Sequence, residues 1–255
     1  MDRIGINTDK EYNLSTFDKN VSFEVERNKQ VYLLLEKIAA ADSVEINILD
    51  NAELHLSILA DEEIKNMNLT ANLGKNSQLI VYFADFSIGE NKLFANINLN
   101  EENAKVEWHL ASLSGQKDRK ELSVSVLHNK PQTYARVDNY GVAKDDSRLV
   151  FSGTSHILHG SIKTKTQQNA KIMVFDEFSD AVAKPILKID ENDIEASHSA
   201  AVGKISDEHL FYLTSRGLTM EEARTIITLG YLKPIFKGFN EEKIDYMNEI
   251  IGGRL

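Results

Sequence analysis

Short runs in which apolar and polar residues alternate fill the chain as far as about residue 205. Clear examples are Val44–Ile48, Leu54–Ile58, Leu122–Val126 and Ile186–Ile189. Alternation with a period of two places every second side chain on one buried face, which is the pattern of a β-strand. Clusters rich in Asn, Gly and Asp separate the runs. The pattern predicts many short strands joined by tight turns.

A weak repeat runs through this region, in which Asn is followed by a small residue, a polar residue and an aliphatic residue. It occurs at Asn51–Leu54, Asn76–Leu79, Asn103–Val106 and Asn169–Ile172. The first spacings are 76 − 51 = 25 and 103 − 76 = 27 residues. Strands that repeat at this period predict the stacked coils of a β-solenoid, with each Asn in a turn and each aliphatic residue beginning an inward row. The alternative is chance turn chemistry between the unrelated strands of a β-sandwich.

The pattern becomes helical after residue 205. Ser206 is placed to N-cap a first helix that ends at Gly217, and Thr219 with Glu222 is typical of a capping box that begins a second helix. A third helix is expected after Asn240. The sequence therefore predicts an N-terminal extension over residues 1–29, a β-helix core over 30–205 and a C-terminal helical segment over 206–255.

Composition and charge exclude several classes of function. The chain has 255 residues, a net charge of −10 and no cysteine. The charge argues against nucleic-acid binding and against an anionic membrane surface. Without thiolates the chain cannot hold an iron–sulfur cluster in the usual all-cysteine way. No signal-like or membrane-spanning apolar segment is visible, because the longest apolar run is Val31–Leu35, so we expect a cytoplasmic protein.

No motif predicts a catalytic site. A P-loop, a G-x-S-x-G elbow and an H-E-x-x-H helix are all missing from the sequence. His156 and His159 lie in a strand-like context, where side chains three residues apart point to opposite faces, so they are not expected to share a metal. His198 stands out because small residues flank it and let another chain approach, although a structural role is the plainer interpretation of the residue alone.

The region from His198 onward resembles the SufB/SufD family of iron–sulfur cluster assembly proteins. The residues that carry the resemblance are Ser197-His198-Ser199-Ala200 with Val202-Gly203, then Leu210–Leu218, then Glu222-Ala223-Arg224. Further residues upstream fall in the family's order and spacing, namely Val150–Gly153, Thr164, Gln167, Gln168-Asn169, Lys184–Leu187 and Asp193. Because it has no cysteine, the chain resembles the SufD branch of the family rather than the SufB branch. The resemblance implies a mainly β fold, a right-handed parallel β-helix with a C-terminal α-helical segment. It also suggests a shortened member of the family, one that lacks the N-terminal helical domain.

The same resemblance implies a non-catalytic scaffold in a cluster assembly complex. It implies pairing with a SufB-like subunit, in which Ser197, His198, Ser199 and Ala200 lie at the interface. His198 is then the candidate ligand of a transient iron–sulfur cluster shared with that partner, with no cofactor intrinsic to this chain. Ser199 departs from the glycine usual in the family, and Ala196 from a cysteine found in some relatives.

The helical segment is implied to dock an ABC-type, SufC-like ATPase. The candidate contacts are Tyr212, Arg216, Glu221 and Arg224.

Two other functions fit a solenoid. A carbohydrate-binding or carbohydrate-active β-helix needs clustered acids or an exposed aromatic row, whereas the one tryptophan, Trp108, lies in an alternating run and is expected to be buried or at an interface. A self-associating structural protein is the other alternative, since an uncapped end coil invites pairing. The isolated chain is accordingly expected to form a homodimer.

Overall fold

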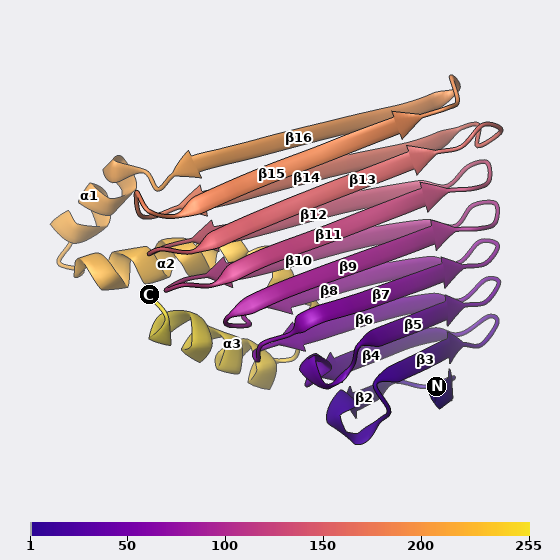
Figure 1. The fold of residues 1–255 in the computed structure, drawn as a ribbon, viewed down its shortest axis with the longest axis horizontal. Coiled ribbons are helices and arrows are strands. Elements are labelled where there is room, and N and C mark those ends of the chain that lie inside the picture. Colours follow the sequence, from indigo (N-terminus) through magenta and orange to yellow (C-terminus); the bar gives the residue numbers. More distant parts are fainter. Residues whose placement is uncertain (1) are drawn as a thin grey trace.

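The computed structural model describes residues 2–255, so Met1, the first residue of the predicted N-terminal extension, lies outside the described residues. Two eight-stranded parallel sheets are stacked face to face and are followed by helices (Figure 1). Successive strands alternate between the two sheets, so the chain winds upward as a β-solenoid. The prediction of a mainly β, parallel β-helix with a C-terminal helical segment is confirmed.

The odd-numbered strands form one sheet, which we call the odd sheet. It contains β1 (Asp2–Ile6), β3 (Asn20–Val25), β5 (Ser43–Ile48), β7 (Lys65–Leu73), β9 (Glu90–Leu99), β11 (Arg119–His128), β13 (Arg148–Ile157) and β15 (Asp180–Ile189). The even sheet contains β2 (Lys10–Asn13), β4 (Gln30–Glu36), β6 (Glu53–Ala60), β8 (Gln78–Asp85), β10 (Lys105–Ser114), β12 (Tyr134–Ala143), β14 (Thr164–Val174) and β16 (Ile194–Lys204). Short 3-10 turns follow β2 (η1, Leu14–Thr16) and β4 (η2, Ile38–Ala40). The segment predicted as an extension therefore contributes β1, β2 and β3, which pair in register with the later strands.

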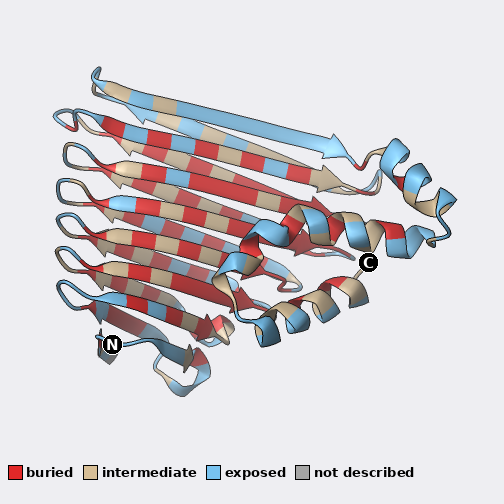
Figure 2. Ribbon diagram, turned by 180° about the vertical axis from the view of Figure 1, so that it is seen from behind, coloured by how far each residue is buried: buried red, intermediate tan, exposed pale blue. Residues whose placement is uncertain are grey.

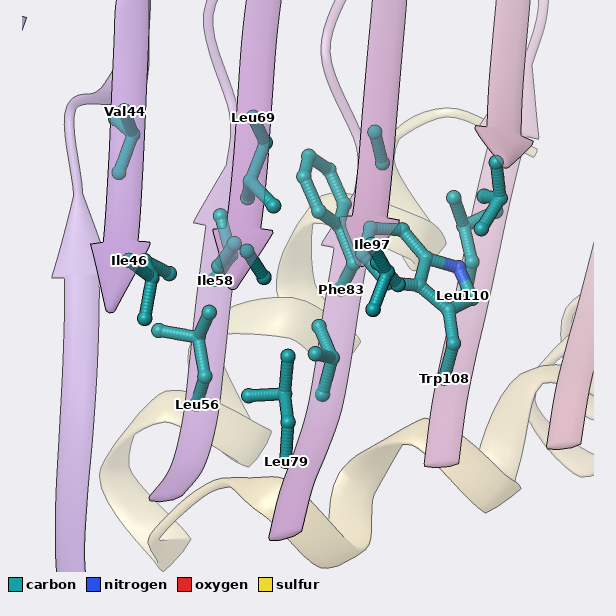
Figure 3. Close-up of a cluster of buried hydrophobic side chains, with 14 of the residues drawn as sticks. Val44, Ile46, Leu56, Ile58, Leu69, Leu79, Phe83, Ile97, Trp108 and Leu110 are labelled. Atoms are coloured by element: carbon teal, nitrogen blue, oxygen red, sulfur yellow. The ribbon is translucent and has the colours of Figure 1, made fainter. Parts of the chain in front are cut away.

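The core lies between the two sheets, where the inward rows of both meet (Figure 3). These rows are the apolar halves of the alternating runs, and most of their aliphatic and aromatic side chains are fully buried. Trp108 is 0% exposed and stacks on Phe83 with 6.0 Å between ring centroids. Burying each large apolar side chain stabilises the fold by about 1.5–3 kcal/mol before the entropy of ordering is counted. Trp108 is thus a core residue and offers no sugar-stacking surface.

The Asn repeat marks the turns at one end of the coils in three of its four copies. Asn51, Asn76 and Asn103 have φ of 57°, 53° and 59°, the left-handed conformation that Asn tolerates better than most residues. Their side chains form a ladder, in which each Nδ2 donates to the Oδ1 of the Asn one coil earlier, at 3.0 and 3.1 Å. For Asn169 the prediction is wrong, because it lies inside β14, and Lys163, with φ of 58°, takes the turn position of that coil.

A charged pair is enclosed within the solenoid near the other end of the coils. Lys120 Nζ lies 3.0 Å from Asp85 Oδ2, and both side chains are 0% exposed. The ammonium also donates to the carbonyl of Leu113 at 2.9 Å, and Ser112 Oγ donates to the same carboxylate at 2.6 Å. Burial lowers the pKa of Lys120, and the nearby Asp85 carboxylate opposes that shift. The pair is satisfied because every charged atom has a partner within reach.

Three helices and a 3-10 turn follow β16: α1 (Asp207–Ser215), α2 (Met220–Leu232), η3 (Lys233–Gly238) and α3 (Glu241–Gly253). The predicted caps are present. Ser206 Oγ accepts the backbone N–H of His209, and Thr219 forms a capping box with Glu222. Gly217 has φ of +97°, which a residue with a side chain rarely adopts. No helix within residues 2–255 is long and apolar enough to cross a membrane.

The helices cover part of the outer face of the even sheet (Figure 2). They bury outward residues of that sheet, namely Leu59, Ala84, Ala111, Leu113 and Val142, against residues of the helical segment such as Ala223, Leu232, Met247 and Ile251. The backbone comes close to the sheet at Gly238, where an added Cβ would lie 2.4 Å from Tyr82. The backbone carbonyl of Gly238 also accepts a hydrogen bond from Ser57 Oγ. The helical segment is therefore fixed to the outside of the solenoid.

Candidate functional site

The end coil, made of β15 and β16, is the most exposed part of the solenoid. Both strands lie at a sheet edge, so each is paired on one side only among the described residues. Figure 2 shows β16 as an almost wholly exposed strand, and its side chains from Ser197 to Lys204 are all exposed. Apolar side chains are exposed here as well, with Ile186 at 44%, Ile189 at 45% and Val202 at 47%. An unpaired strand edge with apolar surface is a template for another chain.

Pro185 makes the two edges of the end coil unequal. It lies inside β15, although the alternating run in the sequence begins only after it, at Ile186. Proline has no N–H to give to a ladder, which an edge strand tolerates and a central strand does not. β16 contains no proline and offers an uninterrupted backbone edge of 11 residues. It is therefore the better strand for adding a partner.

His198 is in the inward row of β16, at the open end of the solenoid. It pairs in register with Gln168 of β14, whose side chain is inward and 3% exposed. The imidazole is exposed because no further coil covers it, and it has no hydrogen-bond partner within residues 2–255. Ser197 and Ser199 point to the opposite face of the strand, and Ala200 follows His198 in the inward row. The structure thus presents one free imidazole on the end coil.

A polar network lies directly beneath His198. Gln168 Nε2 donates to Ser155 Oγ at 2.7 Å and to the carbonyl of Ile186 at 3.2 Å, while Thr166 Oγ1 donates to the same serine oxygen at 2.9 Å. Gln168 Oε1 is buried and has no partner among the described residues. The core thus changes from apolar in the middle coils to polar just below the end coil.

A second polar row crosses the outer face of the even sheet and ends at Ser199. Ser199 Oγ donates to Asn169 Oδ1 at 2.7 Å, and Asn169 Nδ2 donates to Asp138 Oδ1 at 2.7 Å. Arg136 Nε donates to the other oxygen of Asp138 at 2.7 Å, and His109 Nδ1 lies 3.5 Å from that oxygen. Burial alone would raise the pKa of Asp138, but the hydrogen bonds from His109, Asn169 and Arg136 outweigh it and hold the pKa at about 2. Asp138 is therefore an ionised anchor for this row.

The helical segment presents a second apolar surface, which we call the helix face: Phe211, Tyr212, Met220 and Ile226. These side chains are 74%, 58%, 51% and 48% exposed. The Arg216 guanidinium lies 5.2 Å from the ring centroid of Tyr212. Glu221 is exposed in the first turn of α2.

Arg224, the fourth candidate for ATPase contact, has partners within the chain. Its Nη2 atom is 3.5 Å from Asp176 Oδ1, and its guanidinium is 5.4 Å from the ring centroid of Phe175. These contacts tie α2 to the loop between β14 and β15. Arg224 is therefore held by contacts within the chain, whereas the other three candidates, Tyr212, Arg216 and Glu221, are exposed.

No group of three or more His, Asp or Glu side chains within residues 2–255 is arranged to hold a metal ion. His156 Nε2 is 2.8 Å from Asp190 Oδ2, and His159 lies in the following turn, with its Nδ1 3.7 Å from Glu191. With no thiolate and a single free imidazole at the end coil, this chain can supply one conventional ligand to an iron–sulfur cluster there. The remaining ligands would have to come from another molecule.

Gln168 was noted only among the residues that carry the family resemblance, and Asp138 was not noted; neither was expected at the site. A signal existed for Gln168, because the alternation of β14 places this polar residue in an inward row. What that row faces depends on the register between strands 30 residues apart, 198 − 168 = 30. Asp138 gave no signal, since its partners His109 and Asn169 come from two other strands, β10 and β14, and only Arg136 lies on its own strand.

Comparison with known proteins agrees with this architecture. The sequence model of the family described as "SUF system FeS cluster assembly, SufBD core domain" matches residues 8–231. The iron–sulfur cluster assembly protein SufD of Bacillus subtilis is 34% identical over 113 residues, which is 44% of this chain and 26% of that protein. SufD of Escherichia coli is 25% identical over 200 residues, which is 77% of this chain and 47% of the relative. A SufBD family protein of Mycobacterium tuberculosis is 29% identical over 150 residues, 59% of this chain and 18% of that protein. The chain thus spans less than half the length of these relatives.

Proposed function

Because the chain belongs to the SufBD core domain family of the SUF iron–sulfur cluster assembly system, we propose that it acts as a non-catalytic scaffold subunit. In this role it pairs with a SufB-like subunit through its end coil and docks an ABC-type ATPase through its helical segment. The observation that carries the proposal is the end coil itself, which combines an unpaired 11-residue edge strand, exposed apolar side chains and one free imidazole.

Pairing at the end coil follows from backbone chemistry. The outer edge of β16 presents N–H and C=O groups that a strand of the partner can satisfy by edge addition. The small side chains of Ser197, Ser199 and Ala200 let the partner backbone approach closely. Ile186, Ile189 and Val202 supply the apolar area that such an interface buries. The same edge would let two copies of the isolated chain pair as a homodimer.

His198 is proposed to bind cluster iron at this interface. The cluster is the cargo of the complex, and the chain has no cofactor of its own. A neutral imidazole is a good iron ligand, and the thiolates that a cluster needs come from the SufB-like partner because this chain has none. Sharing ligands in this way would place cluster assembly where the two subunits meet.

The helix face is proposed to dock the ATPase. Its exposed aromatic and aliphatic side chains lie on α1, which follows β16 directly, and on α2. Tyr212, Arg216 and Glu221 are free to make these contacts. Arg224 would act by holding α2 in place through Asp176 and Phe175.

Reconstitution with a SufB-like subunit and the ATPase tests the role of His198. We expect His198→Ala to keep the complex intact on size-exclusion chromatography and to lower the yield of cluster formed anaerobically from iron and sulfide several-fold. His159→Ala is the matched control, because His159 is a surface residue with a side chain 91% exposed in a turn. A cluster yield equal to that of the wild type would contradict a ligand role for His198.

Binding measurements with the ATPase test the helix face. The double variant Phe211→Ser and Tyr212→Ser is expected to weaken ATPase binding at least tenfold, because exposed aromatic side chains dominate such interfaces. Tyr32→Ser is the control, since Tyr32 is 51% exposed on β4, in the opposite end of the solenoid (Figure 1). Equal affinities for all three proteins would show that the ATPase docks elsewhere.

A further inference from the structure

The side chain of Gln168 is held in one orientation beneath the end coil. Its nitrogen faces the carbonyl oxygen of Ile186 at 3.2 Å and Ser155 Oγ at 2.7 Å. A carbonyl oxygen only accepts hydrogen bonds, so the amide atom that faces Ile186 must be Nε2. The other atom, Oε1, is then an acceptor that is fixed in place. It is buried and without a partner within residues 2–255.

An unpaired buried acceptor destabilises a fold, so it calls for an explanation. Here the backbone makes room for the orphaned oxygen. A Cβ on Gly153, on β13, would lie 2.5 Å from Gln168 Oε1. The residue paired with Gly153 in the next coil is Pro185, which has no N–H to offer. The glycine thus lets Oε1 pack against the backbone of β13, and neither Gly153 nor Pro185 supplies a donor to it.

The nearest layer that can supply the donor is the end coil. His198 is the register partner of Gln168, and neighbouring strands lie about 4.8 Å apart, so the two side chains are adjacent in the inward row. His198 has no hydrogen bond of its own among the described residues, and the residue is exposed. A neutral imidazole carries one N–H and one lone pair, and Gln168 Oε1 can accept only the N–H.

We propose that Gln168 is the positioning residue of His198: its Oε1 accepts the imidazole N–H, selects one tautomer and leaves the lone pair of the other ring nitrogen directed at the partner interface. Residues that hydrogen-bond to the remote nitrogen of a ligating histidine orient the ring and fix its tautomer. The inference deepens the proposed function and rests on it, because an oriented lone pair matters only if His198 receives iron.

Nuclear magnetic resonance of the full chain, labelled with ¹⁵N-histidine, tests the hydrogen bond without any iron. The His198→Gln variant identifies the His198 ring signals in a long-range ¹H–¹⁵N correlation spectrum. In the wild type at pH 8 we expect one protonated and one unprotonated ring nitrogen. In Gln168→Met, which keeps the shape but removes the acceptor, we expect the two nitrogen shifts to collapse toward the average of exchanging tautomers.

Gln167→Met is the matched control, because Gln167 is the exposed neighbour on the opposite face of β14 and should leave the spectrum unchanged. Should Gln168→Met fail to fold, Gly153→Ala is the second variant, since its Cβ displaces Oε1 without removing it. Averaged tautomers in the wild type, which would mean that water alone satisfies Oε1, would overturn the proposal. So would identical His198 spectra in the wild type and Gln168→Met.

Iron binding by the complex with the SufB-like subunit separates this inference from the proposed function. Loss of an orienting partner of this kind lowers metal affinity about 10–100-fold, so Gln168→Met should do so while Gln167→Met should not. If His198→Ala leaves cluster yield unchanged, the ligand role fails even when Gln168 fixes the ring. If His198→Ala lowers the yield and Gln168→Met changes neither tautomer nor affinity, only the positioning role fails.

Discussion

Acid should destabilise this protein through one buried side chain, His128. The imidazole is in the inward row of β11 and is 0% exposed. Its Nδ1 lies 2.8 Å from Thr133 Oγ1, whereas Nε2 has no partner among the described residues. Burial disfavours the charged form and lowers the pKa of His128 from 6.5 to about 3. Substituting His128 by Leu removes this titration.

The size of the effect follows from linkage between protonation and folding. Between pH 6.5 and 3 the unfolded chain binds a proton at His128 and the folded chain does not, so the free energy of unfolding falls as the pH falls. A shift of 6.5 − 3 = 3.5 units corresponds to about 5 kcal/mol if the pH passes the whole window. From pH 7 to pH 5 the loss from this residue is about 2 kcal/mol.

Urea unfolding at pH 7 and pH 5 measures this loss, with the fluorescence of the single tryptophan, Trp108, as the probe. In His128→Leu the difference between the two pH values should be about 2 kcal/mol smaller than in the wild type. His159→Asn, in which an exposed histidine is replaced, should retain the wild-type difference. If His128→Leu lost as much stability at pH 5 as the wild type, the buried imidazole would not be the titrating group and the reasoning would be refuted.

Two further predictions concern packing. Lys120→Met should destabilise the fold by about 3–5 kcal/mol in urea unfolding, because it leaves the Asp85 carboxylate buried without its partner. The double variant Lys120→Met with Asp85→Leu should recover much of this lost stability, because it removes the unpaired charge. A double variant no more stable than Lys120→Met would contradict that account. Gly238→Ala should destabilise by about 1–3 kcal/mol in thermal unfolding, since the new Cβ would lie 2.4 Å from Tyr82, and an unchanged melting temperature would show that η3 shifts freely.

Features that depend only on residues close together in the sequence were predictable. The alternating runs identified strands and their inward rows, because the side-chain direction of a strand depends only on residue parity. The caps at Ser206, Thr219 and Gly217 were found for a similar reason, as each bonds to groups within four residues or sets its own φ. The resemblance located His198, and the comparisons support the family, but the position of the ring relative to other side chains was not predictable.

Features that depend on coil length and strand register emerged only in three dimensions. The pairs Gln168–His198 and Asp85–Lys120 join residues 30 and 35 positions apart, and one residue more in any turn would place different side chains opposite each other. Asn169 illustrates this, since the same four-residue pattern is a turn in three coils and a strand in the fourth.

By itself, the sequence determined that this chain would stack strands and end in capped helices, because periodicity and capping are local properties of the backbone. Only the tertiary structure decided which outward residues the helices bury, which buried polar groups find partners and that Gln168 Oε1 does not. The physical reason is that burial and hydrogen bonding depend on what the neighbouring coil supplies, and residues 2–255 contain no further coil beyond the end coil to supply it.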